Sequence, residues 1–355
     1  GFKKEILMLE NNPIDPSNMY KSIYDFPDHI REAQKIGKAI SLKNIYNNIK
    51  NIVVAGMGGS AIGGDVARLL LQNELKIPMY ISRSYRLPNW VDNSTLVICS
   101  SYSGNTEESL SSFKEAQIKK AKIIAISTGG ALSKQVEELG LDIITIPKGL
   151  QPRAALALSF VPMIYLLKTL KLITSKTIND LTNAINLIDT KREVYNKEIN
   201  ENPAYYLANK IYKSLPIIYG ENESTAILAI RWKGQLSENA KMLAYHNELP
   251  EMNHNEIVGW ENNSNLINKI SIIWLKDKDD HPRTTIRQAS TKKIINNLAA
   301  RHEIVSVEGT TKVERYLNMI HMGDWLSFWC AILHGSDPTP VYKIDKLKEI
   351  LSKKS

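Results

Sequence analysis

Cysteine is almost absent from this chain, and so is any long apolar run. The 355 residues include only two cysteines, Cys99 and Cys330, and each lies in an apolar segment. Buried free thiols are therefore expected rather than a disulfide, which suits a reducing cytoplasm. No apolar stretch reaches membrane-spanning length and no signal peptide is recognisable. We therefore expect a cytoplasmic protein with no membrane partner.

Other absences exclude further classes of protein. No Cys/His cluster has the spacing of a metal site, so no metal is expected. The glycine-rich loops carry no Walker lysine, which argues against a nucleoside triphosphate. The net charge of +8 comes from scattered lysines. No basic stripe with interleaved aromatic residues occurs, so nucleic-acid binding is not favoured. A mild positive field also suits a small anionic substrate.

The sequence does contain a regular alternation of short apolar strands with helices. The expected strands are 51–55, 77–81, 95–99, 122–126, 141–146, 215–219, 270–275 and 303–307. This pattern predicts an α/β fold with two doubly wound parallel sheets, each covered by helices on both faces (αβα sandwiches). We expect one domain at 1–170 and another at 171–355. Ligands of such sheets bind at the carboxyl ends of the strands.

The first candidate binding loop is 56–65, between an expected strand and a helix. It has five glycines in nine residues, more than a tight turn needs. Free backbone N–H groups and the helix dipole attract anions at such a junction, and glycines let the main chain approach the ligand. Gly56, Gly58 and Ala61 also fit a dinucleotide-binding pattern. That interpretation needs an acid after the next strand, where only Arg83 stands, so NADP remains a minor alternative.

The second candidate loop, 100–108, carries three hydroxyls close together, on Ser101, Ser103 and Thr106. An ordinary helix N-cap needs only one hydroxyl. A tetrahedral dianion has several acceptor oxygens, and three hydroxyls with nearby amides supply many neutral donors. Phosphate binding is therefore the better interpretation. With the first loop, it gives the candidate phosphate site Gly59, Ser60, Ser101, Ser103 and Thr106.

The Gly-Gly-Ser of the first loop and the Ser-x-Ser-Gly-x-Thr of the second together resemble the sugar isomerase (SIS) domain. The match covers about residues 40–150, and the second half resembles a degenerate SIS domain without the serine cluster. Within this group the chain is most similar to the bifunctional phosphoglucose/phosphomannose isomerases. Three segments carry that resemblance: Pro152–Ala155, Ser237–Lys241 and Leu249–Trp260.

This resemblance implies an aldose–ketose isomerase without a cofactor, acting through an enediol in glycolysis and gluconeogenesis. Such a reaction needs a carboxylate base over C1 and C2 of the sugar, and Glu238 is the candidate. From the residues alone, Glu238 would be a surface partner of Lys241 three positions on. The resemblance reverses that preference. It also assigns Arg153 to stabilise the enediolate charge.

His254 is the candidate for opening the cyclic sugar, because histidine titrates near neutrality. It lies in a polar segment that shows neither a helical nor a strand period. The resemblance further implies a homodimer in which His254 reaches the neighbouring active site. In the C-terminal helix, Val341, Ile344, Leu347 and Leu351 form an apolar stripe, and this places Lys348 on the expected inner face. Lys348 is the candidate active-site lysine, with Lys346 as the alternative.

The predicted function is interconversion of glucose 6-phosphate, and of mannose 6-phosphate, with fructose 6-phosphate. Two alternatives remain open. A sugar-phosphate-sensing SIS protein would keep the serine loops but need neither Glu238 nor His254. An NADP-linked oxidoreductase would use the first loop for a dinucleotide.

Overall fold

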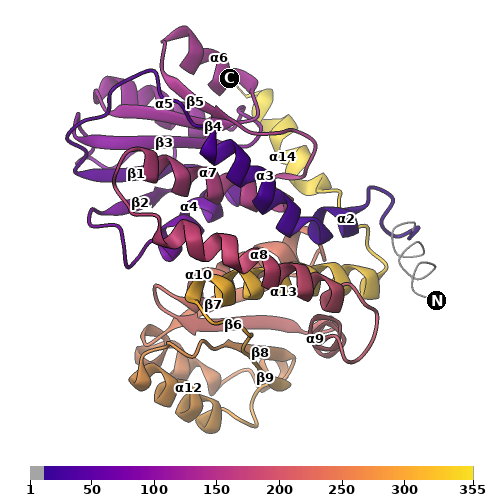
Figure 1. The fold of residues 1–355 in the computed structure, drawn as a ribbon. Coiled ribbons are helices and arrows are strands. Elements are labelled where there is room, and N and C mark those ends of the chain that lie inside the picture. Colours follow the sequence, from indigo (N-terminus) through magenta and orange to yellow (C-terminus); the bar gives the residue numbers. More distant parts are fainter. Residues whose placement is uncertain (1–11, 355) are drawn as a thin grey trace. The chain divides into compact units, whose positions relative to one another are not determined.

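The computed structural model describes residues 12–354, which form two compact units (Figure 1). The N-terminal unit contains residues 25–189 and 308–317. The C-terminal unit contains residues 12–24, 190–307 and 318–354. The chain therefore crosses between the units more than once. The domain boundary expected between residues 170 and 171 stays a prediction.

The N-terminal unit is built on a parallel five-stranded sheet in the order β2-β1-β3-β4-β5. Its strands are β1 (Asn51–Ala55), β2 (Met79–Ser82), β3 (Thr95–Ser101), β4 (Lys122–Ser127) and β5 (Asp142–Thr145). β3 is buried along its whole length, as a strand covered on both faces must be. All five expected strands of this half are confirmed.

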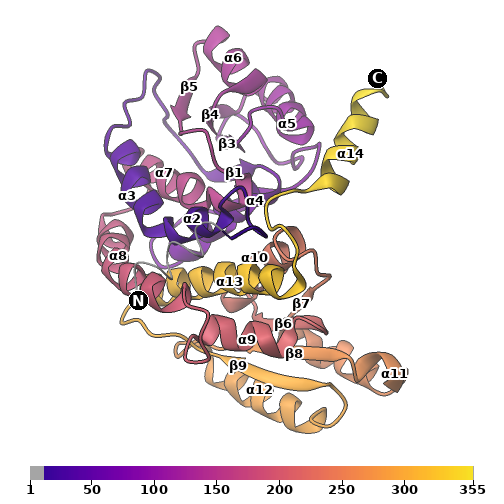
Figure 2. The same cartoon turned by 90° about the vertical axis from the view of Figure 1, so that its right-hand side faces the viewer.

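Helices cover both faces of this sheet. The helices of this unit are α3 (Phe26–Lys38), α4 (Gly58–Leu70), α5 (Glu107–Ile118), α6 (Gly130–Glu138), α7 (Leu156–Thr169) and α8 (Lys176–Tyr195), the last of which continues into the C-terminal unit. α4 packs with α7 on one face, α7 also contacts α3, and α5 and α6 pack together on the other (Figures 1 and 2). α7 is apolar on nearly all sides, and almost every one of its residues is accordingly buried.

The C-terminal unit has a second parallel sheet, in the order β7-β6-β8-β9. Its strands are β6 (Leu215–Glu221), β7 (Tyr245–Leu249), β8 (Ile270–Leu275) and β9 (Arg301–Val305). The predicted class of two parallel α/β sheets is confirmed. β7 was not expected from the sequence, and it lies at the edge of the sheet.

The remaining helices are α2 (Met19–Tyr24), α9 (Pro203–Ile211), α10 (Thr225–Glu238), α11 (Ser264–Ile267), α12 (Pro282–Ile294), α13 (Lys312–His334) and α14 (Tyr342–Ser352). α10 lies on the sheet and packs against α13, where the indole N–H of Trp232 donates to the carbonyl of Met319 at 2.9 Å. Across residues 12–354, no helix combines the length and the apolar character needed to span a bilayer.

The tryptophans are distributed unequally between the two units. Five of the six lie in the C-terminal unit, where all are buried: Trp232, Trp260, Trp274, Trp325 and Trp329. Trp325 and Trp329 both belong to α13. Their rings stack on each other, and each packs edge-on against Phe328. The N-terminal unit has only Trp90, which is 48% exposed.

Candidate active site

The two serine-bearing loops meet at one point on the carboxyl edge of the N-terminal sheet. They follow β1 and β3, which are neighbouring strands, and they lead into α4 and α5 on opposite faces of the sheet. Such a topological switch point is where open α/β sheets bind ligands. The backbone N–H of Tyr102 donates to Ser60 Oγ at 3.3 Å, which joins the two loops directly.

The second loop presents its hydroxyls as a cluster. Ser101 Oγ and Thr106 Oγ1 lie 3.0 Å apart, and the backbone N–H of Gly104 donates to Ser101 Oγ at 3.1 Å. Thr106 is the N-cap residue of α5, but its side chain makes no capping hydrogen bond. The first-turn amides of α5 are therefore not satisfied by this hydroxyl and face the same loop. Ser103 lies in the same loop and is exposed.

Gly104 allows this loop to close. Its φ is +73°, and a Cβ atom there would lie 1.8 Å from the carbonyl oxygen of Gly129, in the loop after β4. No other residue type fits both the backbone angle and the contact. The loop after β4 is itself held by Ser127, whose hydroxyl donates to the carbonyl of Gly129 at 3.0 Å.

Arg153 lies beside the first loop. It belongs to the short 3-10 helix η1 (Pro152–Ala154), which packs on the first turn of α4, and it is only 4% exposed. The structure therefore brings Gly59, Ser60, Ser101, Thr106 and η1 together in one unit. A buried guanidinium next to a helix start, where the dipole favours anions, can stabilise a further negative charge.

Tyr102 also belongs to this group of loops, and nothing in the sequence predicts its role. Its hydroxyl donates to the carbonyl of Pro147 at 3.1 Å and accepts from the backbone N–H of Leu150 at 3.0 Å. Burial raises the pKa of this phenol. Tyr102 thus ties the segment leading into η1 to the loop after β3. No short motif signals such a role, because the partners are main-chain groups.

Glu238 is the last residue of α10. It is half-buried, and its neighbour Asn239 is fully buried with its side chain donating to Ser327 Oγ at 3.0 Å. The ammonium of Lys241 donates to the main-chain carbonyl of Glu238 at 2.7 Å. The segment is thus fixed on both sides of the carboxylate.

His254 lies beyond the carboxyl end of strand β7. It ends η2 (Glu251–His254), which follows β7, whereas Glu238 precedes β7. β7 alone spans roughly 16 Å at about 3.3 Å per residue. Met252 is buried, and Asn253 Nδ2 donates to Thr291 Oγ1 on α12 at 2.8 Å, so η2 is anchored while the His254 side chain is exposed. Within one chain the two predicted groups are therefore held apart.

Lys348 was expected on a buried inner face of the C-terminal helix, and that expectation is wrong for this chain alone. α14 has no buried residue, and Ile344, Leu347 and Leu351 of its apolar stripe are all exposed. The periodicity identified an amphipathic helix correctly, but it does not identify what the apolar face meets. Burial therefore does not distinguish Lys348 from Lys346.

Comparisons with known proteins agree with this architecture. Residues 45–170 match the SIS domain, and residues 200–351 match the bacterial phospho-glucose isomerase C-terminal SIS domain. The chain is 44% identical over 337 residues to a bifunctional phosphoglucose/phosphomannose isomerase of Caldicellulosiruptor bescii, covering 94% of this chain and 99% of that protein. The chain belongs to the bifunctional phosphoglucose/phosphomannose isomerase family.

The chain is also similar to one relative with a different name and to one solved structure. A D-glucosamine-6-phosphate 4-epimerase of Sulfolobus acidocaldarius is 31% identical, over 76% of this chain and 84% of the relative. The C-terminal domain of glucosamine-fructose-6-phosphate aminotransferase from Francisella tularensis superposes with a TM-score of 0.69 at 16% identity, covering 91% of this chain and 98% of that chain. The second likeness shows a shared fold.

The second SIS domain of this isomerase-family chain carries acids where the first carries serines. Glu221 ends β6, and Asp277 and Asp280 follow the neighbouring strand β8. Burial, together with the charges of Glu221 and Asp277, raises the pKa of Asp280 to about 7. A dianion would be repelled from this edge, so the second domain is not suited to a second phosphate site.

Arg83, the residue that kept the NADP alternative open, is already engaged. Its guanidinium pairs with the buried carboxylate of Asp65 on α4. Binding a 2′-phosphate would require breaking that pair and leaving Asp65 buried without it, which is costly. The geometry therefore disfavours the NADP alternative.

Proposed function

We propose that this chain is an aldose–ketose isomerase that interconverts glucose 6-phosphate and mannose 6-phosphate with fructose 6-phosphate. The observation that carries the proposal is the hydroxyl cluster of Ser60, Ser101 and Thr106 at the switch point, beside the uncapped start of α5. Several neutral donors converging on one volume suit a phosphate. Gly59 and Ser103 complete the proposed phosphate site.

The proposed chemistry moves one proton between C1 and C2 of the open sugar. Glu238 takes the proton from one carbon and returns it to the other, and Arg153 stabilises the enediolate formed between the two steps. The oxidation of one carbon balances the reduction of its neighbour, so the reaction requires no redox cofactor. Lys348, or Lys346 in its place, assists in opening the ring.

His254 is proposed to open the ring in the active site of a second copy of the chain. The support is its position, because β7 separates it from Glu238 and its side chain is exposed. A second copy would supply the missing histidine to each Glu238. The proposed assembly is therefore a homodimer with two mixed sites.

The proposed setting is the cytoplasm, in glycolysis and gluconeogenesis. Both cysteines are free and buried, as suits a reducing compartment, and burial raises the pKa of the Cys99 thiol to about 12. Such thiols remain protonated and inert, so the proposed mechanism does not use them.

A coupled assay tests this function. Fructose 6-phosphate formation is measured from glucose 6-phosphate and from mannose 6-phosphate, with glucosamine 6-phosphate as a third substrate because a relative is named as its 4-epimerase. Turnover of either hexose phosphate to fructose 6-phosphate is expected. Binding without turnover would favour the sensing alternative, and NADPH binding seen by fluorescence would favour the oxidoreductase.

A further inference from the structure

The end of α10 has an unusual residue in a position that favours glycine. Lys241 has a φ of +56°, and the backbone N–H groups of Ala240 and Met242 both donate to the carbonyl of Leu236. Helices commonly end with a left-handed residue of this kind, and that residue is usually glycine. A Cβ atom in this conformation comes too close to the following carbonyl oxygen, so a side chain there destabilises the backbone. A non-glycine residue at this position therefore calls for an explanation.

The side chain of Lys241 provides that explanation. Its ammonium donates to the carbonyl of Glu238 at 2.7 Å, to that of Pro338 at 3.0 Å, and more weakly to that of Asn239 at 3.4 Å. The last carbonyls of a helix have no partner within the helix and carry the negative end of its dipole. One cation thus satisfies the end of α10 and ties it to the segment between α13 and α14.

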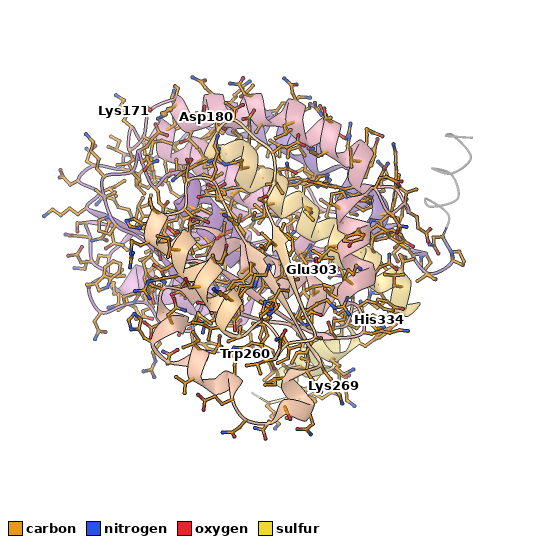
Figure 3. The ribbon with its side chains drawn as sticks, turned by 90° about the horizontal axis from the view of Figure 1, so that it is seen from below. Lys171, Asp180, Trp260, Lys269, Glu303 and His334 are labelled. Atoms are coloured by element: carbon orange, nitrogen blue, oxygen red, sulfur yellow. The ribbon has the colours of Figure 1, made fainter. Side chains whose placement is uncertain are left out.

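Two other lysines show that this bridge is not a general result of the backbone angle. Lys120 and Lys171 follow α5 and α7 with φ values of +57° and +59°. Both side chains are exposed, and within residues 12–354 neither amine makes a hydrogen bond. Lys171 projects at the periphery of the ribbon in Figure 3. The three-carbonyl arrangement therefore distinguishes Lys241 from lysines in the same conformation.

The position of Glu238 makes such a bridge useful. A carboxylate in the last turn of a helix faces the negative end of the dipole, and terminal turns fray. Asn239 anchors one side of this turn through Ser327, and Lys241 anchors the other through Pro338. A displacement of about 1 Å at a catalytic group is enough to reduce turnover a hundredfold.

We propose that Lys241 is a positioning residue for the isomerisation, holding the main chain of Glu238 in place through its bridge to Pro338. The proposal rests on the proposed role of Glu238 as the base. Lys241 itself is not proposed to contact the reacting atoms. It acts through the carbonyl of the residue that does.

The substitution Lys241→Gly tests this directly. It removes the ammonium but supplies the residue that the backbone favours, so the free energy of unfolding should be unchanged or higher. We expect kcat to fall by about tenfold or more, KM to change by less than about threefold, and exchange of the C2 proton with solvent to fall in parallel with kcat. Lys241→Arg, which keeps a charged donor, should retain most of kcat.

Lys171→Gly and Lys120→Gly are the matched controls, because they make the same substitution at the same backbone angle. Both should keep the wild-type kcat. Lys241→Met, which keeps the aliphatic stem without donors, should lose as much kcat as Lys241→Gly. A wild-type kcat in folded Lys241→Gly would overturn the proposal. So would a loss of kcat in Lys241→Gly and Lys241→Met that is fully explained by a smaller folded fraction.

The same experiment separates this proposal from the proposed function. Glu238→Gln should abolish both turnover and C2-proton exchange. If Glu238→Gln is inactive and Lys241→Gly is fully active, the role of Glu238 as the base is supported and the positioning role of Lys241 is wrong. If Glu238→Gln still exchanges the C2 proton, the base itself is wrong.

Discussion

A Cβ atom on Gly59 would lie 2.8 Å from the carbonyl oxygen of Pro152. The contact is with main chain, so a side chain at residue 59 must displace η1 and Arg153 with it. Gly59→Ala should therefore lower kcat by about tenfold or more, because Arg153 would leave the position where charge develops. Steady-state kinetics, with the free energy of unfolding measured by urea, checks this.

Gly234→Ala is the control for that substitution. Gly234 lies in α10, and a Cβ atom there would meet nothing within 4 Å. The helix should gain about 0.5–1 kcal/mol from the alanine with no loss of kcat. Equal kinetics for the two variants would contradict the importance of the η1 contact.

Removing two hydroxyls of the proposed phosphate site should weaken substrate binding. Each hydrogen bond to a charged ligand is worth about 1.5–3 kcal/mol, so Ser101→Ala with Thr106→Ala should raise KM at least a hundredfold. Ser111→Ala is a matched control, because its hydroxyl donates to the carbonyl of Tyr85 instead. An unchanged KM in the double variant would remove the phosphate from this loop.

Mixing two inactive proteins should restore activity if His254 serves the neighbouring chain. Glu238→Gln removes the base, and His254→Ala removes the group that opens the ring. One site of each mixed dimer regains both groups, so activity should rise toward about a quarter of the wild-type value in an equal mixture with random exchange. No rescue after subunit exchange, shown by mass spectrometry, would place both groups in one chain's own site.

His254→Ala by itself should discriminate between substrates. Turnover of the cyclic sugar should fall much more than turnover of an acyclic four-carbon aldose phosphate, because the second substrate needs no ring opening. Equal losses on both substrates would indicate a different role for this histidine.

Asp280 should make the stability of the protein depend on pH. Its pKa is about 7 in the folded chain against an ordinary value of 3.8, so its ionisation opposes folding increasingly as the pH rises between these values. Asp280→Asn keeps an acceptor for the backbone N–H of Asp277 and should be more stable than the wild type at pH 8 but not at pH 4. Urea midpoints at several pH values measure this.

The exposed neighbour Asp279 supplies the control for that series. Asp279→Asn removes the same charge from the same segment, so it should show little pH-dependent difference from the wild type. A difference for Asp280→Asn that is constant with pH would mean that burial of the carboxylate does not govern its ionisation.

The sequence predicted the parallel sheets because buried strands such as 95–99 and 270–275 are predominantly apolar, with one polar residue each. It did not predict β7, whose residues Tyr-His-Asn-Glu-Leu are mostly polar and only partly buried. An edge strand pairs on one side only, and its pattern is correspondingly weak. Without β7, the separation of Glu238 from His254 could not be seen.

The end of α10 is likewise not signalled by the sequence. The chain leaves the helix after Glu238 and turns at Lys241, and the sequence offers no glycine or proline there to signal a stop. The hydroxyl cluster was predicted because its residues are close in sequence. The contacts of Tyr102 were not, since they join segments more than forty residues apart through main-chain groups.

The distribution of tryptophan gives the two units different optical properties. With five of the six indoles in the C-terminal core, emission excited selectively at tryptophan reports mainly on that unit, and replacing the half-exposed Trp90 by phenylalanine would leave the N-terminal unit without an indole. Unfolding followed by emission and by far-ultraviolet dichroism would then record one unit and the whole chain respectively. Coincident curves would mean that the two cores melt together, and separated curves that each domain has a stability of its own.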